Sequence, residues 1–110
     1  MAGKHGELPA PQRSYSGDIY KTTTDISITN NTQYTLTVLY SGPSSRKIVI
    51  SPGYSNSIIL NPGYYKVAAR VSATNVRPFA GTSDLKSGNY SSNFYIRSTS
   101  SFGELPYIKY

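Results

Sequence analysis

Few residues in this chain can carry acid–base or nucleophilic chemistry. His5 is the only histidine among 110 residues, cysteine is absent, and there are five acidic residues. A serine or threonine nucleophile needs a base within hydrogen-bond reach, and that base is usually a histidine. Because His5 lies in a segment of Gly, Pro, Ser and scattered charges that predicts a flexible arm, we do not expect a catalytic triad.

The acidic residues predict neither acid–base catalysis nor a metal site. Two catalytic carboxylates have to be held together in one cleft, whereas Asp25 and Asp84 flank expected turns, where aspartate forms local hydrogen bonds. No cluster of Asp, Glu or His has the spacing of metal ligands, and the lack of cysteine excludes thiolate metal sites. We therefore expect a protein that is not an enzyme and that has no metal and no cofactor.

A combination of tyrosine and basic side chains is the one pattern that indicates a binding surface. The chain has 11 tyrosines, no tryptophan and a formal net charge of +6. In the alternating segment after Gly63, the side chains of Tyr64, Lys66 and Arg70 fall on one outward face. Such a face can stack on bases or sugar rings and attract phosphates. The alternative is that Tyr64 covers a strand while dispersed cations keep the protein soluble.

The positive charge is spread along the chain. Eight basic residues and two acidic residues lie between Lys21 and Arg97, and Arg46-Lys47 is the only adjacent basic pair in this segment. The chain therefore has no polybasic tract of the kind that binds nucleic acid or lipid.

The elements that position these side chains contain a repeated pattern. Ile48 to Tyr54 and Ile58 to Tyr64 are both apolar β-branched runs that close with Pro-Gly-Tyr, ten residues apart. Proline at the second position and glycine at the third are the residues of a type II turn. The pattern predicts three successive strands joined by two tight turns. Tyr54 and Tyr64, each just past its turn, are candidates for contact with a partner.

The alternation of polar and apolar residues predicts seven strands and no helix. We expect the first two strands to form a hairpin through Asn30 to Gln33, and Pro78 confines the sixth to an edge or a bulge. The turn spacing favours an antiparallel two-sheet β-sandwich over residues 18–97. The expected strands cover residues 25–29, 34–40, 46–50, 57–60, 64–71, 76–82 and 89–97.

The two ends of the chain are expected to be flexible arms outside the sandwich, at residues 1–17 and 98–110. The second arm finishes with a strand-like run that can add a strand to a neighbouring sheet. Tyr107, Ile108 and Tyr110 are therefore candidate assembly contacts.

One series of strand and turn signals runs through the middle of the chain. It consists of Ile26-x-Ile28, Asn30-Asn31-Thr32, the run before Pro52-Gly53, and Leu60-Asn61-Pro62-Gly63-Tyr64-Tyr65-Lys66-Val67. From Ile26 to Arg97, the chain resembles small immunoglobulin-like or transthyretin-like sandwich modules of bacterial extracellular proteins. Those modules often begin a strand with Leu-x-Pro-Gly-x-Tyr-x-Val. The resemblance covers about two thirds of the chain and implies a non-catalytic accessory, adhesive or structural module.

Localisation and function follow as expectations. The start of the chain has no apolar run of signal-peptide length, and no stretch of about 18 apolar residues predicts a membrane-spanning helix. The resemblance implies a place outside the cell, at its surface or in the periplasm. We expect a module for protein binding or assembly, self-association included. The alternative is a module that binds carbohydrate or nucleic acid through Tyr and Lys/Arg on an exposed sheet face.

Overall fold

The computed structural model describes the backbone of residues 4–100 and the side chains of residues 6–97. This part of the chain forms eleven strands, and it contains no helix long and apolar enough to cross a membrane. The strands are β1 (Lys4–Glu7), β2 (Gln12–Ser16), β3 (Thr24–Asn31), β4 (Leu36–Ser41), β5 (Ser45–Ile50), β6 (Ser55–Leu60), β7 (Gly63–Val71), β8 (Val76–Arg77), β9 (Phe79–Leu85), β10 (Gly88–Tyr95) and β11 (Arg97–Ser100).

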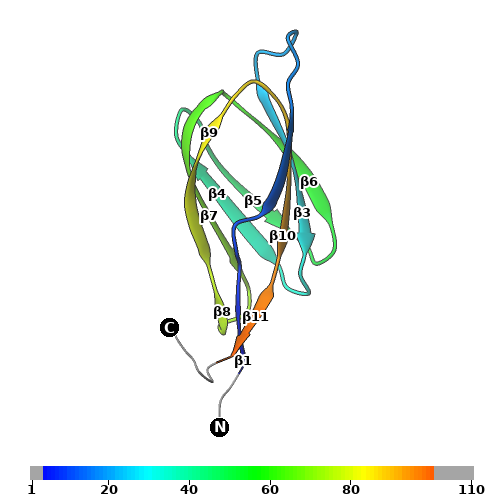
Figure 1. Ribbon diagram of the computed structural model, residues 1–110, viewed down its shortest axis with the longest axis vertical. Coiled ribbons are helices and arrows are strands. Elements are labelled where there is room, and N and C mark those ends of the chain that lie inside the picture. The colour runs from blue at the N-terminus through cyan, green and yellow to red at the C-terminus, as the bar shows by residue number, and fades with distance from the viewer. Residues whose placement is uncertain (1–3, 101–110) are drawn as a thin grey trace.

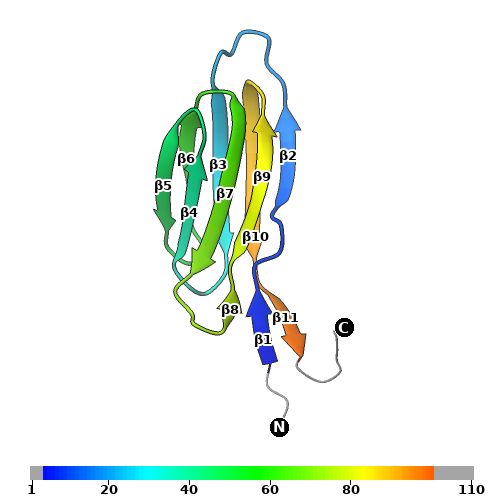
Figure 2. The same ribbon diagram turned by 90° about the vertical axis from the view of Figure 1, so that its left-hand side faces the viewer.

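Two four-stranded sheets pack face to face as a β-sandwich, which confirms the predicted all-β sandwich (Figures 1 and 2). One sheet has the order β2-β10-β3-β6, and the other has the order β5-β4-β7-β9. A small third sheet, β11-β1-β8, extends one end of the molecule (Figure 2).

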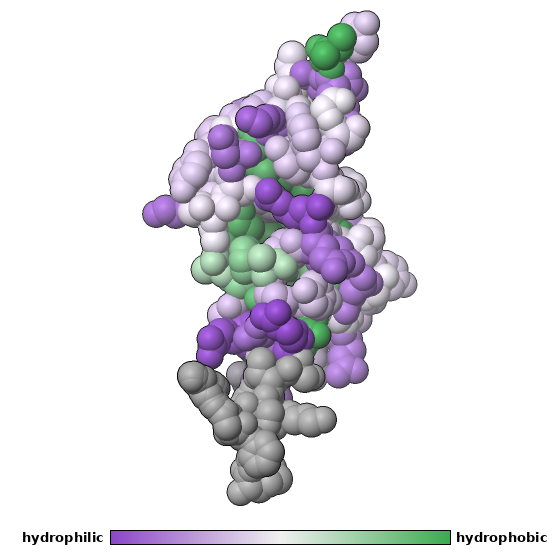
Figure 3. All heavy atoms as spheres, viewed as in Figure 1, coloured by the Kyte–Doolittle hydropathy of each residue, from purple (hydrophilic) through white to green (hydrophobic). Residues whose placement is uncertain are grey.

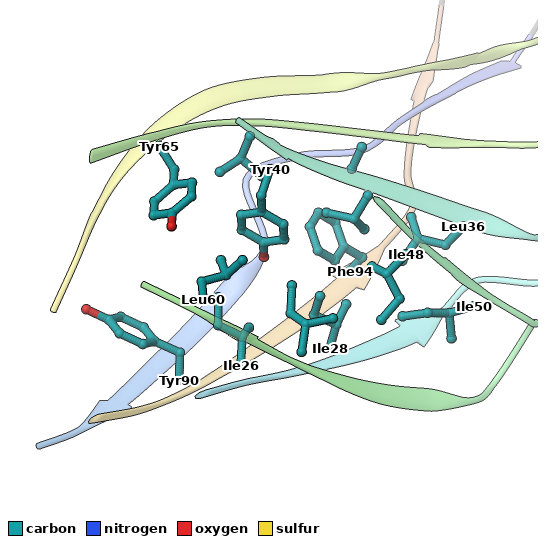
Figure 4. Packing of buried hydrophobic residues seen from close by; sticks show 14 of the residues in the cluster. Ile26, Ile28, Leu36, Tyr40, Ile48, Ile50, Leu60, Tyr65, Tyr90 and Phe94 are labelled. Carbon is teal, nitrogen blue, oxygen red and sulfur yellow. The ribbon is translucent and has the colours of Figure 1, made fainter. Parts of the chain in front are cut away.

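The core follows from the alternation of the strands. In β7 the side chains of Tyr65, Val67, Ala69 and Val71 are buried, as the sequence pattern predicts. They face apolar side chains of the other sheet, among which Phe94 is fully buried (Figure 4). Each large apolar side chain that is removed from water stabilises the fold by roughly 2 kcal/mol.

The predicted hairpin between the first two core strands is wrong, because β3 and β4 lie in different sheets. The chain crosses between the sheets at Asn30, whose side chain is fully buried. Its amide nitrogen donates to the carbonyl oxygens of Tyr34 at 2.8 Å and Ile50 at 2.9 Å, and its amide oxygen accepts from the Thr32 backbone N–H at 3.0 Å. Asn30 thus satisfies backbone groups that a hairpin ladder would otherwise pair.

The two Pro-Gly pairs also lie where the chain crosses between sheets, and they differ from each other. At the first, the Tyr54 N–H donates to the Ser51 carbonyl at 3.1 Å and Gly53 has φ 76, as a type II turn requires. At the second, Gly63 has φ 151 and already pairs with Leu85 as the first residue of β7. The prediction of two type II turns is therefore right for the first copy and wrong for the second.

The expectation of a purely antiparallel sandwich is also corrected. β3 and β10 pair in parallel over the whole of β10, from Thr24 opposite Gly88 to Asn31 opposite Tyr95. β1 and β8 form a second, shorter parallel pair. The other pairs are antiparallel.

The expected N-terminal arm belongs to the fold from residue 4 onward, so that part of the prediction is wrong. β2 pairs antiparallel with β10, and Leu8 is buried in the core. The side chains of β2 are all exposed, so the strand has no inward apolar face that an alternation pattern could reveal. Backbone pairing and contacts of Arg13 and Tyr15 with Tyr90 hold it instead.

Candidate binding surfaces

The outer face of the β5-β4-β7-β9 sheet gathers most of the positively charged candidates. Lys66 and Arg70 project from β7 on the side away from the core, and β5 adds Lys47. Leu39 lies at the centre, opposite Lys47 on one neighbouring strand and Ala68 on the other. We call this surface the basic face. It consists of Thr37, Leu39, Lys47, Val49, Tyr64, Lys66, Ala68 and Arg70.

Apolar side chains remain exposed within the basic face. Leu39 is 43 % exposed and Val49 is 53 % exposed, and both are flanked by cations. Val49 and Arg70 lie on either side of Thr37, in one row across three strands. The basic face therefore combines an aliphatic centre with a positively charged surround.

The cations of the basic face take part in neither of the ion pairs found within residues 6–97. Those pairs join Lys21 to Asp25 at 2.8 Å and Arg97 to Glu7. The hydrogen bond from Lys21 lowers the pKa of Asp25, with a second hydrogen bond from Thr23 acting in the same direction. The acid at the margin of the basic face is Asp84, which lies opposite Tyr64 at one end.

The structure brings together some of the residues that the sequence pointed to and separates others. Tyr64, Lys66 and Arg70 share the basic face. Tyr54 lies near the far end of the sandwich, in the turn after β5, where its carbonyl accepts from the Asn30 N–H at 2.9 Å. It is not part of the basic face. The assembly candidates Tyr107, Ile108 and Tyr110 lie outside the described residues.

The opposite outer face, on the β2-β10-β3-β6 sheet, is mostly polar with little charge, and Ile59 of β6 is an exposed aliphatic side chain on it. Four serines, Ser14, Ser91, Ser27 and Ser57, lie in one row across its four strands. Asn93 and Thr29 continue the same chemistry in the next row. In the sequence, the signal for this face is the alternation of small polar residues along each strand. Their alignment into rows across the sheet depends on the strand order.

Three of the acidic side chains that the structure describes are engaged in local contacts. Glu7 and Asp25 are each engaged by a cation, and Asp18 accepts from the Tyr20 N–H at 2.9 Å. Among the residues that the structure describes, no three His, Asp or Glu side chains lie together as a metal site would need.

A comparison with protein families matches residues 12–93, from the first residue of β2 into β10. The chain belongs to the DUF6759 family, a domain of unknown function. A search of curated proteins found no match. The matched part of this DUF6759 domain contains the whole basic face and the polar face opposite to it, and it leaves out β1 and β11.

Proposed function

We propose that this chain is a non-enzymatic β-sandwich module that binds an acidic partner protein through the basic face. The observation that carries the proposal is the pair of exposed aliphatic side chains, Leu39 and Val49, set among Lys47, Lys66 and Arg70. Protein interfaces commonly have an apolar centre and a polar rim. Complementary charge then steers the partner and fixes its orientation.

A protein partner fits this surface better than a nucleic acid or a glycan. Binding of single-stranded nucleic acid uses successive aromatic rings on which bases stack. Tyr64 is the one aromatic residue of the basic face, and it lies at the end of the face rather than at its centre. The central side chains are aliphatic, and they favour a desolvated protein contact.

The partner is a different chain rather than a second copy bound face to face. Two basic faces in contact would place Lys47, Lys66 and Arg70 against the same charges, which is unfavourable.

Assembly through the C-terminal tail remains a separate prediction. Sedimentation of the chain with and without residues 98–110 tests it, and a monomer in both forms would contradict it.

The same proposal includes the identity and the location of the module. It is immunoglobulin-like or transthyretin-like, it is bacterial, and it is located outside the cytoplasm. The support for this identity is the resemblance from Ile26 to Arg97 and the two-sheet architecture. A fold of this kind serves many functions, so the basic face and not the fold carries the functional argument.

Binding of a short labelled peptide of alternating glutamate and leucine tests the proposal. We expect affinity that falls as salt rises, and a loss of at least about tenfold in the variant Lys66→Glu/Arg70→Glu. Leu39→Ser should also weaken binding, because it removes the apolar centre. Fluorescence anisotropy measures each affinity.

The matched control is Arg77→Glu/Lys86→Glu, which makes the same change of net charge at exposed positions outside the basic face. This variant should keep its affinity within about twofold. Equal losses in both double variants would overturn the proposal. So would tighter binding of a heparin oligosaccharide or an oligothymidylate than of the peptide.

A further inference from the structure

A cleft of about 250 Å³ lies between the two sheets, on the side where β2 and β9 are the edge strands. Ile26 and Phe94 line it from one sheet, and Val67 and Phe79 line it from the other. Figure 3 views the molecule from this side and shows apolar surface between the two sheets. Ligand sites in proteins are clefts lined mainly by apolar side chains with a few polar groups, and this cleft, which opens to solvent, has such a lining.

The cleft contains a buried hydroxyl group that has no hydrogen-bond partner among the side chains and backbone of residues 6–97. Tyr40 is only 5 % exposed. Figure 4 shows its hydroxyl directed from β4 toward the opposite sheet, and none of the hydrogen bonds found among the described side chains involves it. Burial raises the pKa of Tyr40 to about 12, although the charge of Arg13 acts in the opposite direction. The hydroxyl is therefore a neutral hydrogen-bond donor at neutral pH.

The other core tyrosines satisfy their hydroxyl groups within the protein. The Tyr65 hydroxyl donates to the Asn61 carbonyl at 2.6 Å and accepts from the Ser44 N–H at 3.2 Å. The Tyr90 hydroxyl accepts from the Lys86 N–H at 2.9 Å. Buried polar groups in proteins are normally paired in this way. Of these three buried tyrosines, Tyr40 is thus the one whose hydroxyl is not paired within the described part of the chain. Tyr90 also lines the cleft, but its hydroxyl already has a partner.

A cation reaches across the mouth of the cleft. Arg13 extends from β2 to β9, where its guanidinium donates to the Ser83 hydroxyl, and its Cζ lies 5.7 Å from the centre of the Tyr90 ring. Neither of the ion pairs found among the described side chains includes Arg13. Its remaining N–H groups are available to an anion.

We propose that this cleft binds a small apolar monocarboxylate. Arg13 and the Tyr40 hydroxyl hold the carboxylate, and the hydrocarbon part packs against Ile26, Val67 and Phe94. A single cation and a neutral donor match one carboxylate, since guanidinium–carboxylate pairs are strong and geometrically specific. The apolar walls exclude a ligand that is polar throughout. The site is separate from the basic face, so each proposal can fail without the other.

The volume sets the size of the ligand. A water molecule takes about 30 Å³ of liquid volume, so the cleft holds a ligand of about eight non-hydrogen atoms. Hexanoate and benzoate have this size. Acetate is too small to fill the cleft, and drug-sized ligands require larger pockets.

The proposal is tested by titrating the full chain with hexanoate and with benzoate. Isothermal calorimetry and amide NMR shifts measure the binding. We expect both to bind and to shift resonances of β2, β9 and β10, while acetate and hexylamine bind at least about tenfold more weakly. Arg13→Gln and Tyr40→Phe should each weaken hexanoate binding by about tenfold. Arg77→Gln removes the same charge at an exposed position outside both the cleft and the basic face, and it should leave the affinity unchanged.

The proposal is overturned if the unaltered chain binds neither acid, or if hexylamine binds as well as hexanoate. It is also overturned if Arg13→Gln binds hexanoate like the unaltered chain. This variant decides the question even if Tyr40→Phe does not fold, because Arg13 is exposed on an edge strand.

Discussion

At the scale of single residues, Tyr40 and Tyr65 show how much depends on one hydroxyl group. Both rings are buried and pack edge to face with centroids 6.2 Å apart. Within the described part of the chain, the Tyr65 hydroxyl is paired and the Tyr40 hydroxyl is not. The two side chains therefore make similar apolar contributions but different polar contributions to stability.

Removing each hydroxyl should accordingly have different effects. Tyr65→Phe leaves the Asn61 carbonyl and the Ser44 N–H without their partner, and we expect a loss of about 1 to 3 kcal/mol in the free energy of unfolding. Tyr40→Phe removes an unpaired group, and we expect a change within about 0.5 kcal/mol in the absence of ligand. Urea denaturation measures both. A loss for Tyr40→Phe equal to that for Tyr65→Phe would contradict the assignment of Tyr40 as unpaired.

The same residue predicts a dependence of stability on alkaline pH. Burial raises the pKa of Tyr40 from 10.0 to about 12 in the folded state, so the folded protein keeps a proton that the unfolded chain loses. This contribution is fully present below pH 10.0 and is lost as the pH rises to about 12. It is at most about 3 kcal/mol.

Unfolding free energies measured between pH 9 and 12 should fall more steeply for the unaltered chain than for Tyr40→Phe. Other titrating groups affect both proteins, so the difference between the two curves isolates Tyr40. Identical curves would show that the pKa of Tyr40 is the same in the folded and unfolded states.

At the scale of the elements, the sequence predicts which side chains point inward but not which strands are neighbours. The alternation in β7 correctly assigned its inner residues and grouped Tyr64, Lys66 and Arg70 on one outer face. Lys47, Leu39 and Val49 could not be added to that face in advance, because the pairing of β4 with β5 and β7 joins segments that are separate in the sequence.

The crossings between sheets were missed for a related reason. A short polar segment such as Asn30 to Gln33 is compatible with a hairpin and with a crossing. The choice depends on the buried hydrogen bonds of Asn30 to Tyr34 and Ile50, and the bond to Ile50 is a contact between distant segments. The sequence does not predict β2, because backbone pairing rather than an apolar face holds this strand against β10.

Two glycines give a test of how tightly the strands approach each other. Gly53 lies in an open turn with φ 76, and a side-chain carbon there would meet nothing within 4 Å. At Gly88, with φ 131, the same carbon would lie 2.7 Å from the Ser16 carbonyl oxygen. Gly53→Ala should cost about 1 to 2 kcal/mol for its backbone alone, and Gly88→Ala should cost about 1 to 3 kcal/mol more.

Thermal or urea unfolding of the two variants checks this prediction. Gly88→Ala should also broaden the amide NMR signals of β2, because the Ser16 backbone has to move. Equal stability of the two variants would mean that β2 does not approach β10 as closely as the backbone places it.

At the scale of the whole molecule, the two outer faces have different chemistry. The basic face presents cations around an aliphatic centre, and the opposite face presents rows of serine, threonine and asparagine. A partner attracted by charge is therefore directed to one side of the sandwich.

Replacing Ser27 or Ser91 with alanine should leave binding of the acidic peptide unchanged, in contrast to Lys66→Glu/Arg70→Glu. The same anisotropy measurement checks this prediction.

The parallel pairing of β3 with β10 also has a mechanical consequence. Lys4 and Ser100 form the outermost pair of the β1–β11 ladder, so tension applied at these two residues opens that ladder one pair at a time. The β2–β10 ladder then opens from Gln12 and Asn93 in the same manner. The load next enters β3 at Thr24 and β10 at Tyr95, which lie at opposite ends of their ladder.

At that point the tension shears all the hydrogen bonds of the parallel ladder together, so the sandwich should yield only at a much higher force. Single-molecule pulling from residues 4 and 100 should show a weak early event followed by a strong one. Pulling from Thr24 and Gly88, which form a pair at the same end of that ladder, should open it without the strong event. A module with this arrangement can lengthen under small loads while the sheet that carries its basic face stays folded.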